Sequence, residues 1–98
     1  MEIQELTAHM HNFVRAKGWY DVESQRPQTL RNLAISLNLE ASEVLEYFQW
    51  NGELEDLDGL ASELADVTLY LLQIAGIAGI DLEAAVMAKL QQNYKRDW

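Results

Sequence analysis

Apolar residues recur at spacings of three and four along most of the chain, in four segments separated by turns. That spacing matches the 3.6-residue turn of an α-helix, and no segment shows the period of two that a half-buried strand requires. Gly18, Asn51-Gly52 and Gly79 stand where the periodic segments stop, as is common at helix ends. The pattern predicts an all-α fold, an antiparallel four-helix bundle with short connections.

Helices are expected over residues 3–17, 30–50 and 59–78, with Thr29, Asp58 and Asp81 as N-caps. Asp81 caps a last helix in which Leu82, Val86, Leu90 and Tyr94 continue the apolar pattern, and Lys95 and Arg96 suit its C-terminal end. The predicted inward stripe of the third helix consists of Leu60, Leu64, Val67, Leu71, Ile74 and Ala78. Leu69 and Leu72 lie off this stripe and are expected to pack against another subunit. A chain of 98 residues, 49% of them hydrophobic, predicts one domain over residues 1–98 that self-association would help to stabilise.

Composition excludes several functional classes. Sixteen acidic residues against 7 basic ones give a net charge of −9, which disfavours binding to nucleic acid. The absence of cysteine excludes disulfides, thiolate metal sites and cysteine nucleophiles. It also fits a reducing compartment, and the first residues do not resemble a signal peptide, so a cytoplasmic location is expected. The most apolar stretch, Leu64 to Ile80, is interrupted by Asp66 and Gln73 and is too short for a membrane span.

Two pairs of acids, each spaced by three residues, are the main candidates for chemistry: Glu40 with Glu43, and Glu63 with Asp66. Residues three apart share one face of a helix, so antiparallel packing of the two helices would bring the four carboxylates together. Their repulsion is best relieved by a hard divalent cation, and oxygen ligands favour Mg²⁺, with Mn²⁺ as a substitute. Because Mg²⁺ usually keeps sites for substrate phosphates, this predicts a phosphorylated substrate. Glu46 is either a further ligand or a solvated residue.

Aromatic and basic residues accompany the acids. Tyr47 and Trp50 are expected on the glutamate side of the second helix, and Tyr70 one turn from Asp66, where aromatic rings would suit a nucleobase. On the last helix three polar residues follow the spacing i, i+4, i+7 and could bind phosphate oxygens: Lys89, Asn93 and Arg96. Each feature also has a purely structural explanation, since acid pairs often face solvent and aromatic residues often form cores. His9 and His11 point to different faces, cannot chelate one ion together and are expected to be solvated.

Four motifs together resemble the MazG-like and dCTP-pyrophosphatase branch of the all-α NTP pyrophosphohydrolases, over about Trp19 to Arg96. They are Arg31-Asn32-Leu33, Glu40-Ala-Ser-Glu43 running into Phe48-Gln49-Trp50, Glu63-Leu-Ala-Asp66, and Lys89 with Asn93 and the basic tail. One departure is Leu39, because many MazG members carry a second glutamate before the one at Glu40.

The resemblance implies Mg²⁺-dependent hydrolysis of a (deoxy)nucleoside triphosphate to the monophosphate and pyrophosphate, as nucleotide-pool house-cleaning. It implies that the metal is held by Glu40, Glu43, Glu63 and Asp66 and that the protein is a homodimer or homotetramer. Trp19 and Trp50 would flank the base, and Lys89 and Asn93 would meet phosphates. The remaining residues of the predicted substrate-binding set are Arg31, Tyr70 and Arg96.

The expected mechanism is in-line attack by water on the α-phosphorus, with Glu43 or Glu46 orienting or deprotonating that water. Two other functions stay open at this point: a noncatalytic helical module that senses nucleotides or docks a partner protein, and a purely structural oligomeric bundle. Four acids favour the enzyme over a protein-docking groove, which would be apolar. The preferred base and sugar are left open.

Overall fold

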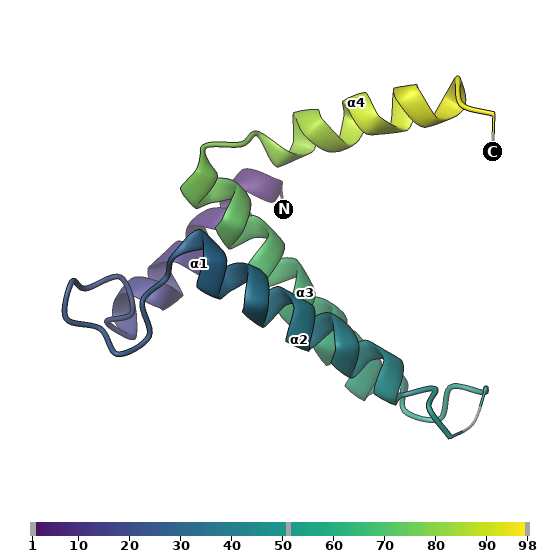
Figure 1. The fold of residues 1–98 in the computed structure, drawn as a ribbon, viewed down its shortest axis with the longest axis horizontal. Helices are drawn as coiled ribbons and strands as arrows, with labels where there is room; N and C mark the ends of the chain where they lie inside the picture. The colour runs from purple at the N-terminus through teal and green to yellow at the C-terminus, as the bar shows by residue number, and fades with distance from the viewer. Residues whose placement is uncertain (1, 51, 98) are drawn as a thin grey trace.

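The structure is a computed structural model that describes residues 2–50 and 52–97, and these contain four helices and no strand. The helices are α1 (Ile3–Ala16), α2 (Leu30–Glu46), α3 (Leu57–Ala78) and α4 (Leu82–Tyr94). Figure 1 shows α2 and α3 lying side by side and antiparallel, with α1 crossing behind α3 and α4 extending away from the other three. The predicted all-α fold is confirmed.

Side-chain caps explain where three helices begin. Thr29 Oγ1 accepts a hydrogen bond from the Asn32 N–H at 3.1 Å, and Asp81 Oδ1 accepts one from the Ala84 N–H at 3.0 Å. The cap of α3 is Asp56 rather than the predicted Asp58, because Asp56 Oδ1 accepts from the Gly59 N–H at 2.9 Å and the helix starts two residues earlier than expected. Each cap satisfies an N–H group that the first helical turn leaves without a partner.

The C-terminal end of α2 differs from the expectation, which carried this helix to residue 50. The N–H groups of residues 47–49 donate to carbonyl oxygens three residues earlier, at 3.3, 2.9 and 3.5 Å. Such bonds tighten the last turn toward 3₁₀ geometry and end the regular helix at Glu46. Trp50 therefore lies beyond the helix, with 90% of its surface exposed.

The core lies between α1 and α3. Met10 and Val14 of α1 contact Leu72 of α3, which is only 3% exposed. The prediction that Leu72 packs against another subunit is therefore wrong, because α1 covers it within the chain. On the predicted inward stripe, by contrast, Leu64 and Leu71 remain 49% and 43% exposed.

A glycine on α3 explains how α1 approaches this face so closely. A Cβ atom at Gly76 would lie 2.7 Å from Nε2 of His11, so a larger residue would collide with the histidine ring. Because α3 is apolar on several sides, the periodicity of the sequence did not identify which side meets α1. Gly76 and the small Ala75 next to it, which is buried, favour the observed side.

Helix α4 is exposed along most of its length, and helix α3 is unusually apolar. Helix α4 contains no buried residue, and Val86, Met87 and Leu90 on it are all exposed. Helix α3 has a mean hydropathy of 1.3 over its most apolar stretch, so by length and composition alone it would also pass for a membrane-spanning helix. In this fold it is the central helix, with both α1 and α2 packed against it.

Candidate active site

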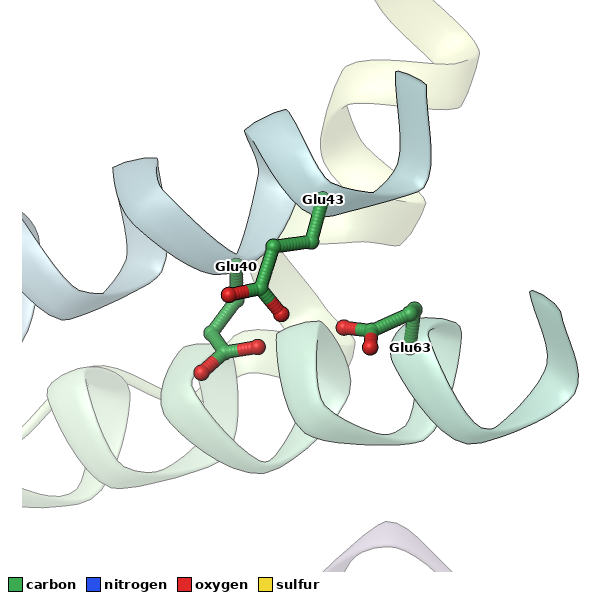
Figure 2. A group of neighbouring side chains, drawn as sticks. All are labelled: Glu40, Glu43 and Glu63. Carbon is green, nitrogen blue, oxygen red and sulfur yellow. The ribbon is translucent and has the colours of Figure 1, made fainter. Parts of the chain in front are cut away.

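Three glutamates converge between α2 and α3. Glu40 and Glu43 come from one face of α2 and Glu63 from the facing side of α3, and Figure 2 shows their carboxyl groups turned toward one another. One carboxylate oxygen from each lies within 4.8 Å of the other two, and all three residues are half-buried. Asp66, one turn after Glu63, lies outside this group but close enough to act electrostatically on Glu40.

The convergence changes how these carboxyl groups titrate. Desolvation, a hydrogen bond with Glu43 and repulsion from Glu43 and Glu40 raise the pKa of Glu63 to about 7. Desolvation also raises the pKa of Glu40, with further contributions from Glu43 and Asp66. Repulsion between like charges and the loss of water both disfavour the ionised forms.

Two oxygens in this group have no donor. Glu40 Oε2 and Glu63 Oε2 are buried without a hydrogen-bond partner among the residues that the structure describes. A buried acceptor that lacks a donor is costly, and a positive ion would satisfy both oxygens and remove the repulsion. Oxygen-only ligands of this kind fit a hard divalent cation, so Glu40, Glu43 and Glu63 are the candidate metal centre.

A cavity of about 680 Å³ lies beside the acids, between α1, the segment after it, the start of α2 and α3. Phe13, Trp19 and Leu69 contribute to its apolar wall, and the polar residues around it include Gln28, Asn32 and Gln73. Its volume is within the range of small-molecule sites, which are mostly apolar with a few polar groups. Asp66 lines this cavity and also acts on Glu40, so the cavity adjoins the metal centre.

Trp19 is held as part of the cavity wall. Its N–H donates to the Val14 carbonyl at 3.2 Å after Gly18 has turned the chain with a φ of 75°. The indole meets the Phe13 ring edge-on, with centroids 5.6 Å apart, and the Arg26 guanidinium lies 5.3 Å from the indole centroid. These contacts fix the orientation of an aromatic surface that faces the cavity.

Of the predicted substrate-binding residues, the structure brings Trp19 and Tyr70 to the cavity that Asp66 adjoins. The others are not on its wall: Arg31 is exposed in the first turn of α2, and Trp50 is exposed beyond α2. Lys89 and Asn93 lie on α4, and Arg96 follows the end of that helix. Glu46 is exposed in the last turn of α2, outside the glutamate group. The role of each of these residues stays a prediction.

Sequence reasoning missed a set of hydrogen-bonded residues at the cavity. His11, expected to be solvated, is half-buried, with Nδ1 2.6 Å from the Tyr20 hydroxyl, because Gly76 lets its ring approach α3. Gln73 Nε2 donates to the Tyr20 hydroxyl at 3.3 Å and to Gln28 Oε1 at 2.7 Å. The available signal was Gln73 itself, a polar residue within an apolar run, which in the sequence argued only against a membrane span.

Comparison with known proteins identifies relatives of this chain. Residues 35–97, which include all four acids, match the MazG-like family. The dCTP pyrophosphatase 1 proteins of Rattus norvegicus and Homo sapiens are each 35% identical over 75 residues, and that of Bos taurus is 33% identical. These alignments cover 67% of this chain and 44% of each relative, so the chain spans less than half the length of the relatives it matches.

A solved structure shows the same fold. A pyrophosphatase from Archaeoglobus fulgidus superimposes with a TM-score of 0.76 and 30% identity, over 95% of this chain and 89% of that one. The helical fold is therefore shared with a solved pyrophosphatase, and the acids of α2 and α3 lie within the segment that matches the family. The chain belongs to the MazG-like family, as the sequence motifs predicted.

Proposed function

We propose that this protein hydrolyses nucleoside or deoxynucleoside triphosphates to the monophosphate and pyrophosphate, with Mg²⁺ as cofactor and Mn²⁺ as a substitute, and that it acts in clearing the nucleotide pool. The observation that carries this proposal is that a glutamate group suited to a divalent cation adjoins, through Asp66, a cavity in the size range of small-molecule sites. The pyrophosphatase names of the relatives and of the similar structure support it.

In this mechanism the chain's residues place the triphosphate and the attacking water. The cavity with Trp19 and Tyr70 holds the base and sugar, which sets the phosphates at the end where Asp66 and the glutamates lie. A bound divalent cation would neutralise phosphate charge and lower the pKa of water. Glu43 orients the water and accepts its proton as the oxygen attacks the α-phosphorus. The bond from the α-phosphorus to the bridging oxygen breaks, and pyrophosphate leaves.

The position of bond cleavage tests this proposal. With a nucleoside triphosphate and Mg²⁺ in ¹⁸O-labelled water, mass spectrometry should find the label in the nucleoside monophosphate and none in pyrophosphate. The reason is that water attacks the α-phosphorus and the two outer phosphates leave as one group. Nucleoside diphosphate and labelled orthophosphate as first products would contradict the proposal. Tight nucleotide binding without turnover would instead support a sensor.

We also propose that the protein functions as a homodimer or homotetramer. A folded monomer of 11.2 kDa is expected to expose about 5,700 Å², whereas this chain exposes 7827 Å². An excess of about 2,100 Å² per chain is of the size that subunits of obligate oligomers bury. The exposed Leu64 and Leu71 of α3 and the unpacked α4 are the surfaces available for it. In this arrangement α4 of one subunit would bring Lys89 and Asn93 to the phosphates of another.

Sedimentation velocity over a wide range of protein concentrations should therefore find a species of at least twice the 11.2 kDa chain mass. Leu90→Asp, which places a charge on the exposed apolar side of α4, should shift the distribution toward monomer, because a buried unpaired charge opposes association. A monomer at every concentration would refute the oligomer.

A further inference from the structure

Gln73 is a buried polar residue that the proposed chemistry does not use. It lies in the apolar second half of α3, is only 4% exposed, and lines the cavity. It follows Asp66 by seven residues and Tyr70 by three, so these three residues share one face of α3. A rise of 1.5 Å per residue places Gln73 about 10 Å along the helix from Asp66. The cavity wall therefore carries a carboxylate, Asp66, and an amide, Gln73, about two helical turns apart.

The hydrogen bonds around Gln73 determine which of its two terminal atoms is the oxygen. The backbone carbonyl of Arg26 only accepts, so the Gln28 atom 2.7 Å from it must be the amide nitrogen. The other terminal atom of Gln28 is then its oxygen, and the Gln73 atom 2.7 Å from that oxygen must be a nitrogen. A fixed backbone acceptor thus orients both side-chain amides.

The second hydrogen of the Gln73 nitrogen is used as well. It points to the Tyr20 hydroxyl at 3.3 Å, and the Tyr20 hydroxyl lies 2.6 Å from Nδ1 of His11. Desolvation and the charge of Arg15 lower the pKa of His11, which favours the neutral ring and lets Nδ1 accept the hydroxyl proton. The hydroxyl can then accept from Gln73, so both amide hydrogens of Gln73 have partners.

The carbonyl oxygen of the Gln73 side chain, Oε1, is the polar atom that these hydrogen bonds do not use. Among the described residues no hydrogen bond reaches this atom, although the side chain is almost entirely buried. Gln73 lines the cavity, from which we infer that Oε1 is the atom it presents there. About two helical turns from Asp66, the cavity therefore offers a fixed acceptor that requires a donor from the ligand.

We propose that Gln73 is a specificity-determining residue: its oxygen accepts a hydrogen bond from an exocyclic amino group of the base, so the enzyme prefers amino bases such as cytosine and adenine. This inference rests on the proposed function. A base with a carbonyl at the same position, such as uracil or hypoxanthine, would place its carbonyl oxygen next to Oε1 of Gln73. Both atoms are acceptors, so no hydrogen bond could form. The chain of bonds through Gln28 to the Arg26 carbonyl prevents the amide from turning round to donate instead.

Two substrate pairs test the proposal, because each differs at this edge of the base: dCTP with dUTP, and dATP with dITP. In at least one pair the amino base should have a kcat/KM about 10-fold or more above its partner, the effect of leaving a buried polar group unpaired. Equilibrium binding of dCMP and dUMP, or of dAMP and dIMP, should show the same preference. The pair that discriminates identifies the base as a pyrimidine or a purine.

Substitutions connect the preference to Gln73. Gln73→Met keeps the length of the side chain but removes the oxygen, and should reduce the preference to less than about twofold, mainly by weakening the amino substrate. Gln28→Met leaves Gln73 in place but frees the Gln73 amide to rotate, so it should also reduce the preference for the amino base. This variant tests the proposal if Gln73→Met does not fold. Gln4→Met, the same change at an exposed position of α1, should keep the wild-type preference.

The outcomes separate the two proposals. If the wild-type protein hydrolyses none of the four nucleotides, the proposed function fails. If it hydrolyses both members of each pair equally well, or if the preference survives in Gln73→Met and Gln28→Met, only the role of Gln73 is refuted. A general loss of stability would lower activity on both members of a pair and leave their ratio unchanged, so the ratio is the deciding measurement.

Discussion

Replacing Glu43 by glutamine should lower turnover by at least about 100-fold, the scale of losing a positioned proton acceptor. The substitution keeps the shape of the side chain and its place on α2. It removes one negative charge from the group in which Glu43 lies within 4.8 Å of Glu40 and Glu63, and with it the group that accepts a proton from the attacking water. Steady-state measurement of pyrophosphate release, with circular dichroism as a test of folding, would detect this loss.

Glu46→Gln is the matched comparison, because it makes the same change one turn later on the same helix. Glu46 is exposed and lies outside the glutamate group, so its substitution should cost far less turnover than that of Glu43. A fully active Glu43→Gln protein would refute the proposed mechanism. The reverse order, with Glu46→Gln the more damaged variant, would assign the base to Glu46 instead.

Mg²⁺ should raise the melting temperature of the protein, because a ligand that binds only the folded state stabilises it. The gain is RT ln(1 + [L]/Kd), about 2.7 kcal/mol at a concentration of 100 Kd. The two buried oxygens without donors, on Glu40 and Glu63, are the groups that the ion would satisfy. Differential scanning fluorimetry with and without nucleotide would measure the effect. Indifference to Mg²⁺ in both conditions would refute the metal centre.

The stability of the metal-free protein should depend on pH, and the raised pKa of Glu63 gives the direction of that dependence. The pKa of Glu63 is about 7 in the folded protein against an ordinary value of 4.5, so between these values the folded state holds a proton that the unfolded chain has released. Without metal, stability should therefore fall as pH rises from about 4.5 to about 7 and level off above. Metal ions bind the deprotonated carboxylates, so the gain from Mg²⁺ should be largest above pH 7.

Glu63→Gln separates the two effects. Without metal at pH 8 it should melt at a higher temperature than the wild type, because one repelling charge is gone. It should also gain less from Mg²⁺, because one ligand is gone. Glu23→Gln, an exposed change in the segment before α2, should alter neither property. A wild-type protein whose metal-free stability rises between pH 4.5 and pH 7 would contradict the account of Glu63.

The fold was predictable because each helix carries its own signals. The periodicity, the caps at Thr29 and Asp81 and the left-handed Gly79, with a φ of 72°, are local features that tertiary packing did not override. The orientation of α3 was not predictable, because its apolar residues lie on more than one side. Leu72 and Leu71 are adjacent in sequence and equally apolar, and only the position of α1 decides that Leu72 is the buried one.

The convergence of Glu40, Glu43 and Glu63 was predictable for the same local reason, since a spacing of three brings side chains to one face of a helix. Asp66, predicted to join them, lies outside the group. The cavity was not predictable. Its walls come from α1, the segment after it and α3, whose relative placement depends on packing rather than on any one periodicity. Gln73 illustrates the difference: its polarity is visible in the sequence, but its partners Tyr20 and Gln28 lie 53 and 45 residues away.

The hairpin of α2 and α3 supplies all four acids, whereas the cavity also needs α1 and the segment that follows it. Contacts between neighbouring helices have low contact order and form early in folding, so the acidic centre can assemble before the cavity does. The hairpin must then close against the repulsion of its own carboxylates. A divalent cation that relieves this repulsion would speed closure, so the ion that we propose for turnover would also affect how quickly a newly made chain reaches its native fold.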